Sequence, residues 1–127
     1  MVEPKKIRSL AMRVLNPMES FDSDATPPDT IGDAIGVYDA GDGTVPLWVT
    51  TAGVVRDGES GVLRFDAMAE VQAPDSKSRE EQNSRRISVI MEDGTREIVV
   101  VAGGRGRLCD SFEFSRFLSR AARLSRQ

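Results

Sequence analysis

The segment closest to a ligand-binding pattern is Gly103-Gly-Arg-Gly-Arg107, which lies directly before a predicted helix. Glycine lets the backbone approach an anion closely, and the guanidinium groups of Arg105 and Arg107 would add two positive charges. The spacing matches neither the phosphate-binding loop GxxxxGK[ST] nor the dinucleotide signature GxGxxG. An ordinary exposed loop is the simpler interpretation, and anion binding at Arg105 and Arg107 stays an open alternative.

Catalytic chemistry has few suitable side chains in this chain. There is no histidine and only one cysteine, which excludes Ser-His-Asp triads, histidine acid–base catalysis and zinc sites built from several cysteines. Cys109 lies near Arg105 and Arg107, and neighbouring cations favour the thiolate. A lone cysteine between a strand and a helix is nevertheless typical of a small packed residue. We therefore predict a protein that is not an enzyme and needs no cofactor.

Carboxylates that could hold Ca²⁺ or Mg²⁺ are present but poorly spaced. Asp22 and Asp24 form one acidic pair, and Asp39 and Asp42 form another. The stretch Asp39-Ala-Gly-Asp-Gly-Thr44 fails the EF-hand spacing and lacks the bidentate glutamate. Because Asp and Gly are favoured in turns, turn chemistry explains these acids better. We predict no metal site.

Charge is distributed unevenly along the chain, whose net charge is −3. Both ends are basic, and residues 14–55 carry seven acidic and no basic side chains. A nucleic-acid-binding domain is usually basic as a whole, so no nucleic-acid partner is expected. The N-terminal cations have two open interpretations: a solvated helix face, or a surface for anionic ligands such as lipids. They are Lys5, Lys6, Arg8 and Arg13.

Amphipathic patterns predict a helix at each end, over residues 1–17 and 110–125. Pro17 ends the first pattern, and Asp110 with Glu113 resembles a capping box at the start of the second. The predicted buried faces are Ile7, Leu10, Ala11 and Val14 in the first helix, and Phe114, Phe117, Leu118 and Ala121 in the second. Arg116, Arg120 and Arg123 lie opposite that second stripe.

Between the helices, residues 18–33 predict an acidic loop or linker, because they offer almost nothing to bury. Residues 34–102 predict an antiparallel sheet. Its strands are expected at 35–38, 47–55, 63–71, 87–91 and 97–101. Leu63 to Val71 alternates apolar and polar side chains, which indicates one strand with one solvent-exposed side. The expected faces are Leu63, Phe65, Ala67, Ala69 and Val71 on the buried side, and Arg64, Asp66, Met68 and Glu70 on the exposed side. Asp93-Gly94 between two apolar runs indicates a hairpin.

The order of these elements predicts a single domain over residues 1–127 with an α+β, mainly β fold. The expected architecture is a small curled sheet or partly open barrel that is capped by the C-terminal helix, with a further helix at the N-terminus. A length of 127 residues, with 39% hydrophobic and 29% charged residues, suits one soluble domain. Arg8 and Arg13 interrupt the only candidate signal-peptide core, so a cytoplasmic location is expected.

Two strand patterns resemble the core of bacterial pleckstrin-homology-like domains. They are Val49-Thr-Thr-Ala-Gly-Val-Val55 and Gly61-Val-Leu-Arg-Phe-Asp-Ala-Met-Ala-Glu-Val71. The likeness continues through the 87–101 hairpin and the terminal helix, over about residues 45–125. A full seven-stranded barrel needs more strands before Leu47 than residues 34–39 supply, so either the acidic third contains further strands or the barrel is incomplete. The resemblance implies a binding or scaffolding module without catalysis.

Our functional expectation is a module that binds another protein or its own copy, through a sheet edge or the groove beside the C-terminal helix. An incomplete barrel leaves an edge beside Ile35 to Tyr38 that needs covering, which would favour a homodimer. Trp48, Ile35 and Val37 are the predicted interface residues. The alternative is a peripheral membrane module that uses the apolar face and the cations of the first helix. An enzyme is the remote alternative.

Overall fold

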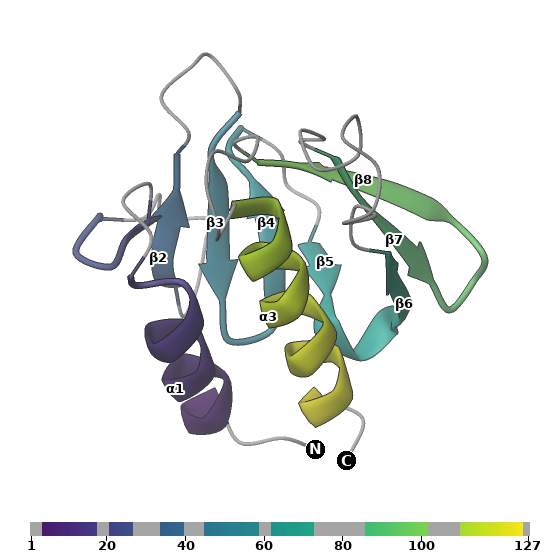
Figure 1. The fold of residues 1–127 in the computed structure, drawn as a ribbon, viewed down its shortest axis with the longest axis horizontal. Helices are drawn as coiled ribbons and strands as arrows, with labels where there is room; N and C mark the ends of the chain where they lie inside the picture. The colour runs from purple at the N-terminus through teal and green to yellow at the C-terminus, as the bar shows by residue number, and fades with distance from the viewer. Residues whose placement is uncertain are drawn as a thin grey trace.

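Two antiparallel sheets and two helices make up the described part of the chain (Figure 1). The computed structural model describes residues 4–17, 21–26, 34–39, 45–58, 62–72, 86–101 and 110–125. Within these ranges, no helix is both long and apolar enough to cross a bilayer. The expected α+β, mainly β fold class is confirmed at this level.

The larger sheet has five strands in sequence order, and the smaller sheet has three. The first contains β1 (Phe21–Asp22), β2 (Ala34–Tyr38), β3 (Leu47–Thr50), β4 (Gly53–Arg56) and β5 (Val62–Arg64). The second contains β6 (Met68–Gln72), β7 (Arg86–Met91) and β8 (Arg96–Val100). No ladder between described strands joins the two sheets, so they do not form a closed barrel.

Helix α1 (Pro4–Val14) confirms the predicted N-terminal helix. Its apolar stripe is buried: Ile7 and Ala11 are 0% exposed, Leu10 is 3% exposed and Val14 is 5% exposed. The opposite face carries the exposed cations. This division is what helical spacing of the apolar residues dictates.

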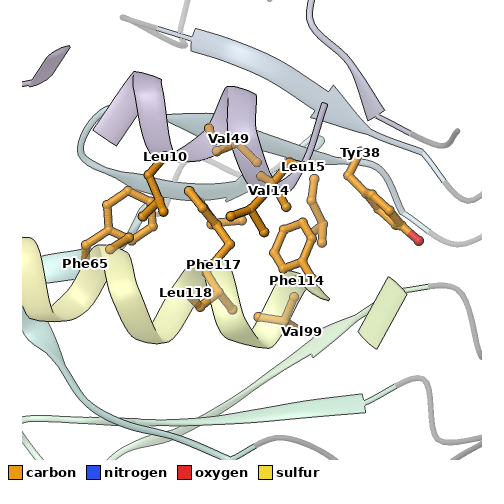
Figure 2. Close-up of a cluster of buried hydrophobic side chains, with 14 of the residues drawn as sticks. Leu10, Val14, Leu15, Tyr38, Val49, Phe65, Val99, Phe114, Phe117 and Leu118 are labelled. Carbon is orange, nitrogen blue, oxygen red and sulfur yellow. The ribbon is translucent and has the colours of Figure 1, made fainter. Parts of the chain in front are cut away.

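Helix α3 (Asp110–Ser125) has the bounds expected from the sequence. Phe114 and Phe117 are fully buried and meet Tyr38 of β2 and Phe65 in edge-to-face contacts, with ring centroids 5.4 and 5.7 Å apart (Figure 2). Such aromatic pairs contribute about 0.5–1.5 kcal/mol beyond the area that they bury. One hydrophobic cluster therefore joins both helices to both sheets.

The predicted hairpin between β7 and β8 is confirmed. Ile90 pairs with Arg96, and the Met91 N–H donates to the Thr95 carbonyl at 2.8 Å, which leaves a three-residue loop. Gly94 closes that loop with a φ of +87°, a conformation that costs glycine little. The hairpin is fixed by local turn chemistry.

The single strand expected over 63–71 is wrong. The 3₁₀ helix η1 (Phe65–Ala67) divides it into β5 and β6, which belong to different sheets. The turn shifts the alternation, so Met68 is 1% exposed and Ala69 is exposed, the reverse of the expected faces. Burial of both Phe65 and Met68 in the core favours the turn over a continuous strand.

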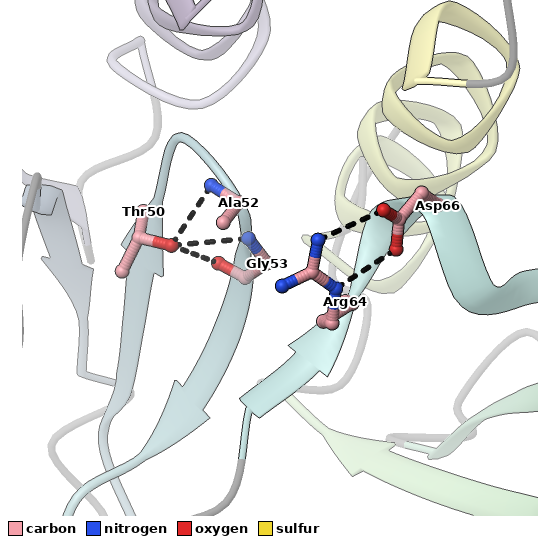
Figure 3. A network of polar contacts seen from close by, with 5 residues as sticks. All are labelled: Thr50, Ala52, Gly53, Arg64 and Asp66. Carbon is pink, nitrogen blue, oxygen red and sulfur yellow. Dashed lines mark hydrogen bonds and ion pairs between the residues drawn. The ribbon is translucent and has the colours of Figure 1, made fainter. Parts of the chain in front are cut away.

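The stretch expected as one strand over 47–55 is instead the hairpin of β3 and β4. The Thr50 hydroxyl accepts hydrogen bonds from the Ala52 and Gly53 N–H groups, at 3.1 and 3.0 Å, and donates to the Gly53 carbonyl at 2.9 Å (Figure 3). A Cβ at Gly53 would lie 2.2 Å from the carbonyl oxygen of Leu63, so only glycine fits there. Strand-forming residues on both sides concealed this turn.

The acidic segment expected as a linker contributes a strand. Phe21 and Asp22 of β1 pair with Tyr38 and Val37, and Phe21 is 6% exposed in the core. A Cβ at Gly36 would lie 2.6 Å from the Phe21 ring, so that glycine admits the ring. The edge beside β2, expected to be open, is therefore paired in part by the N-terminal segment.

Candidate functional site

A groove runs between strand β6 and helix α3. It consists of two adjoining hollows of about 320 and 550 Å³ that share Val71, Ser119 and Arg123. The strand side is completed by Met68, Ala69 and Glu70, and the helix side by Glu113, Ser115, Arg116, Arg120 and Ala122. The groove follows α3 from residue 113 to residue 123, which is about 15 Å at 1.5 Å per residue.

Strand β6 is an edge strand of its sheet, since β7 is its only partner among the described strands. Its first residue, Met68, is buried in the core, and Val71 packs partly buried against that core. Small side chains at Ala69, Ser119 and Ala122 keep the hollow open. The outer edge of a sheet is a place where an extended peptide can add as a further strand.

Arginines dominate the helix wall of the groove. Arg116, Arg120 and Arg123 follow the i, i+4, i+7 spacing and so share one exposed face of α3. Arg116 approaches Glu113 at 3.8 Å, with side chains that are 51% and 20% exposed, so solvent weakens this contact. Glu70 on the strand is the other acid in the lining. Cations outnumber acids, and the groove favours a negatively charged occupant.

The predicted basic residues of α1 lie elsewhere. Lys5, Lys6 and Arg13 line a separate hollow of about 390 Å³ beside the end of α3, whereas Arg8 is exposed outside that lining. The apolar face of α1 belongs to the core. Insertion of this face into a bilayer, which the membrane alternative requires, would therefore expose the core.

The predicted interface residues are mostly covered. Ile35 is 3% exposed and belongs to the core, and Val37 is partly buried. Trp48 is 7% exposed, and its indole N–H donates to an Asp57 carboxylate oxygen at 3.1 Å. Val37 and Trp48 are paired in register on the face of the first sheet that points away from the core cluster. Ile35 thus acts as a core residue in this conformation.

The remaining sequence candidates give no site in the described part of the chain. Arg105, Arg107 and Cys109 lie outside the described residues, as does Asp42. Within those residues no group of histidine, cysteine or acidic side chains could hold a metal ion. The Asp22 carboxylate instead accepts a hydrogen bond from the Asp24 N–H at 2.8 Å, which is the turn chemistry expected of it.

The groove residues Arg116, Arg120 and Arg123 were visible in the sequence as a helix face but not as a site. Their regular spacing identifies a shared helix face in the sequence. No sequence pattern indicates that β6 lies beside that face. No family model, curated protein or solved structure matches the chain.

Proposed function

We propose that this chain is a non-catalytic, pleckstrin-homology-like binding module that holds an extended, acidic segment of a partner protein in the groove between β6 and α3. The observation that carries the proposal is that β6, which pairs only with β7 among the described strands, lies beside a helix wall of three arginines. The sheet-then-helix order supports the family resemblance. Binding here requires no catalytic group.

Dimensions support an extended occupant. About five residues of a strand span the estimated 15 Å, since a strand rises about 3.3 Å per residue. The strand edge supplies backbone hydrogen-bonding groups, which give affinity without selecting a sequence. Side chains on alternate positions of the occupant would point to opposite sides. One set would face Val71 and the arginines, which line the same hollow, and the other set would point away from it.

Charge complementarity selects acidic segments over basic ones. Arg120 is exposed and no described acid forms an ion pair with its guanidinium group, so it is available to a carboxylate. Exposed ion pairs contribute about 0.2–1 kcal/mol each. The arginines therefore set orientation and association rate as much as affinity.

A fluorescent peptide of about eight alternating Glu and Val residues tests the proposal by anisotropy titration. We expect saturable binding that weakens with salt. Arg120→Glu should weaken peptide binding roughly tenfold, because the attraction between Arg120 and the peptide carboxylates is replaced by a repulsion of about the same size. Ser119→Trp should abolish it by filling the groove. Arg96→Glu, an equal charge change at an exposed position of β8, is the matched control and should leave the affinity unchanged.

The same titration with a Lys and Val peptide checks the sign of the charge. Equal binding of both peptides, or an equal loss in Arg96→Glu, would refute the acidic-segment proposal. A second copy of the chain is the competing occupant. In that case the mass measured by light scattering would rise from that of a monomer to that of a dimer as the protein concentration increases. The Ser119→Trp variant would remain a monomer.

A further inference from the structure

The hollow between α1 and the end of α3 is independent of the groove. It is lined by Lys5, Lys6, Ser9, Leu10, Arg13 and Leu124. Three of these side chains are cations and none is an acid. Its volume of about 390 Å³ lies in the usual range for small-molecule sites, about 300–1,000 Å³.

The positive charges in this hollow are held close together by the helix. Lys6, Ser9 and Arg13 follow the i, i+3, i+7 spacing and so share one face of α1. No described carboxylate forms an ion pair with Lys5, Lys6 or Arg13. The first turn of α1 also contains no acid, so no carboxylate among the described residues offsets the positive end of the helix dipole. These cations repel one another, and an anion would relieve the repulsion.

The other part of the lining is apolar. Leu10 is 3% exposed and Leu124 is partly buried, and both pack with the core. A hydrated inorganic anion gains nothing from such a surface, whereas an apolar group attached to the anion would be removed from water there. The lining therefore fits a ligand with one anionic and one apolar part.

We propose that this hollow binds a phosphate monoester that carries an apolar group. The phosphate, with a charge of about −1.5 to −2 at neutral pH, contacts Lys5, Lys6 and Arg13, and the apolar group lies on Leu10 and Leu124. A soluble phosphorylated amphiphile and the headgroup of a membrane lipid share this chemistry. Neither source requires α1 to leave the core, because the cations are exposed in the folded chain.

Hexyl phosphate is the probe for the site itself, titrated into the isotope-labelled protein and followed by amide chemical shifts. We expect saturable shifts at Ser9 and Leu124. Lys6→Ala and Arg13→Ala should each weaken binding about tenfold, the effect of losing one charge-assisted contact. Arg8→Ala is the matched control, because Arg8 is an exposed cation on the same helix outside the hollow. The affinity of the Arg8→Ala variant for hexyl phosphate should stay within about twofold of that of the unmodified protein.

Three results would overturn the proposal: no saturable shifts with the folded protein, equal weakening in Arg8→Ala, or inorganic phosphate binding as tightly as hexyl phosphate. The substituted side chains are exposed, so melting curves should show that the variants remain folded. Arg120→Glu, which tests the other groove, should leave hexyl phosphate binding intact. Failure of one proposal therefore does not imply failure of the other.

Vesicles distinguish the two sources of the ligand. The protein is sedimented with phosphatidylcholine vesicles that contain phosphatidic acid. Co-sedimentation would support the site and assign a lipid headgroup to it if Arg13→Ala abolishes it and hexyl phosphate competes with it. Hexyl phosphate binding without such co-sedimentation would support the site and assign a soluble ligand. Co-sedimentation that persists in Arg13→Ala would contradict recognition by this hollow.

Discussion

At the scale of single residues, Thr50 and the Arg64–Asp66 pair fix the two turns that the alternation pattern did not reveal. The Thr50 hydroxyl is buried and makes three hydrogen bonds within its turn. The Arg64 guanidinium group donates to both carboxylate oxygens of Asp66, at 3.0 and 2.9 Å, across the start of η1 (Figure 3). The hydrogen bonds of Thr50 are buried and the Arg64–Asp66 ion pair is exposed, so the two should contribute differently to stability.

Thr50→Val should destabilise the protein by about 1–3 kcal/mol, because the variant keeps the shape but leaves the buried Gly53 N–H without its acceptor. Urea unfolding measures this change. Thr51→Val is the control, since Thr51 lies next in the chain and no described residue hydrogen-bonds to its hydroxyl. Equal effects at both positions would show that the Thr50 hydroxyl has no special role.

The hydrogen bond from Arg64 lowers the pKa of the Asp66 carboxyl below its ordinary value. A lowered folded-state pKa means that the stabilisation is complete above the unfolded pKa of about 3.9 and is lost as pH falls through the folded value. We expect Asp66→Asn to be slightly less stable than the unmodified protein near neutral pH. The difference should vanish in acid.

Urea unfolding of both proteins at several pH values checks this expectation. The effect should be small, because the Arg64 and Asp66 side chains are 60% and 45% exposed. Asp24→Asn, which removes an exposed carboxylate without an ion pair among the described residues, is the control and should be as stable as the unmodified protein near neutral pH. A difference that grows in acid would contradict the sign of the argument.

At the scale of elements, α3 connects the two proposed sites and completes the core. Its buried face contacts both sheets, and its exposed face carries the groove arginines. Its last turn contributes Leu124 to the hollow beside α1. Changes on the buried face should therefore affect stability, and changes on the exposed face should affect binding.

Phe117→Ala and Leu118→Ala should each destabilise the protein by about 2–5 kcal/mol, since both side chains are 0% exposed and their removal leaves cavities. Thermal and urea unfolding measure the loss. Ser119→Ala, the next position and an exposed one, should change stability by less than about 0.5 kcal/mol. Unchanged melting in both core variants would mean that α3 does not pack on the sheets.

At the scale of the whole molecule, one core and the contacts of Arg56 with β8 unite the two sheets. The core cluster includes residues from α1, α3 and both sheets. Arg56 of β4 also reaches across to β8, where its guanidinium group donates to the Ile98 carbonyl at 2.7 Å. Elements that share a core in this way should unfold together.

We therefore expect a single cooperative unfolding transition. Trp48 is the only tryptophan and reports on the first sheet, whereas far-ultraviolet circular dichroism reports on all the elements. The two signals should give the same midpoint in guanidinium chloride. Separate midpoints, with the first sheet lost independently, would show that the sheets are distinct folding units.

The sequence by itself determined the features whose information is local. The helix bounds and buried faces follow from apolar residues at helical spacing, and the β7–β8 hairpin follows from Asp93-Gly94, because each is decided within a few residues. The cation stripes on α1 and α3 could be read in the same way.

Tertiary structure decided the rest, because the residues concerned are placed by distant partners. Phe65 and Met68 are both drawn into the shared core, which breaks an alternation that fits a continuous strand. Phe21 becomes a strand residue only because Gly36 leaves room for its ring. Likewise, the arginines of α3 line a groove only because η1 redirects the chain so that β6 lies alongside them. Burial against remote segments outweighed local pattern at each of these positions.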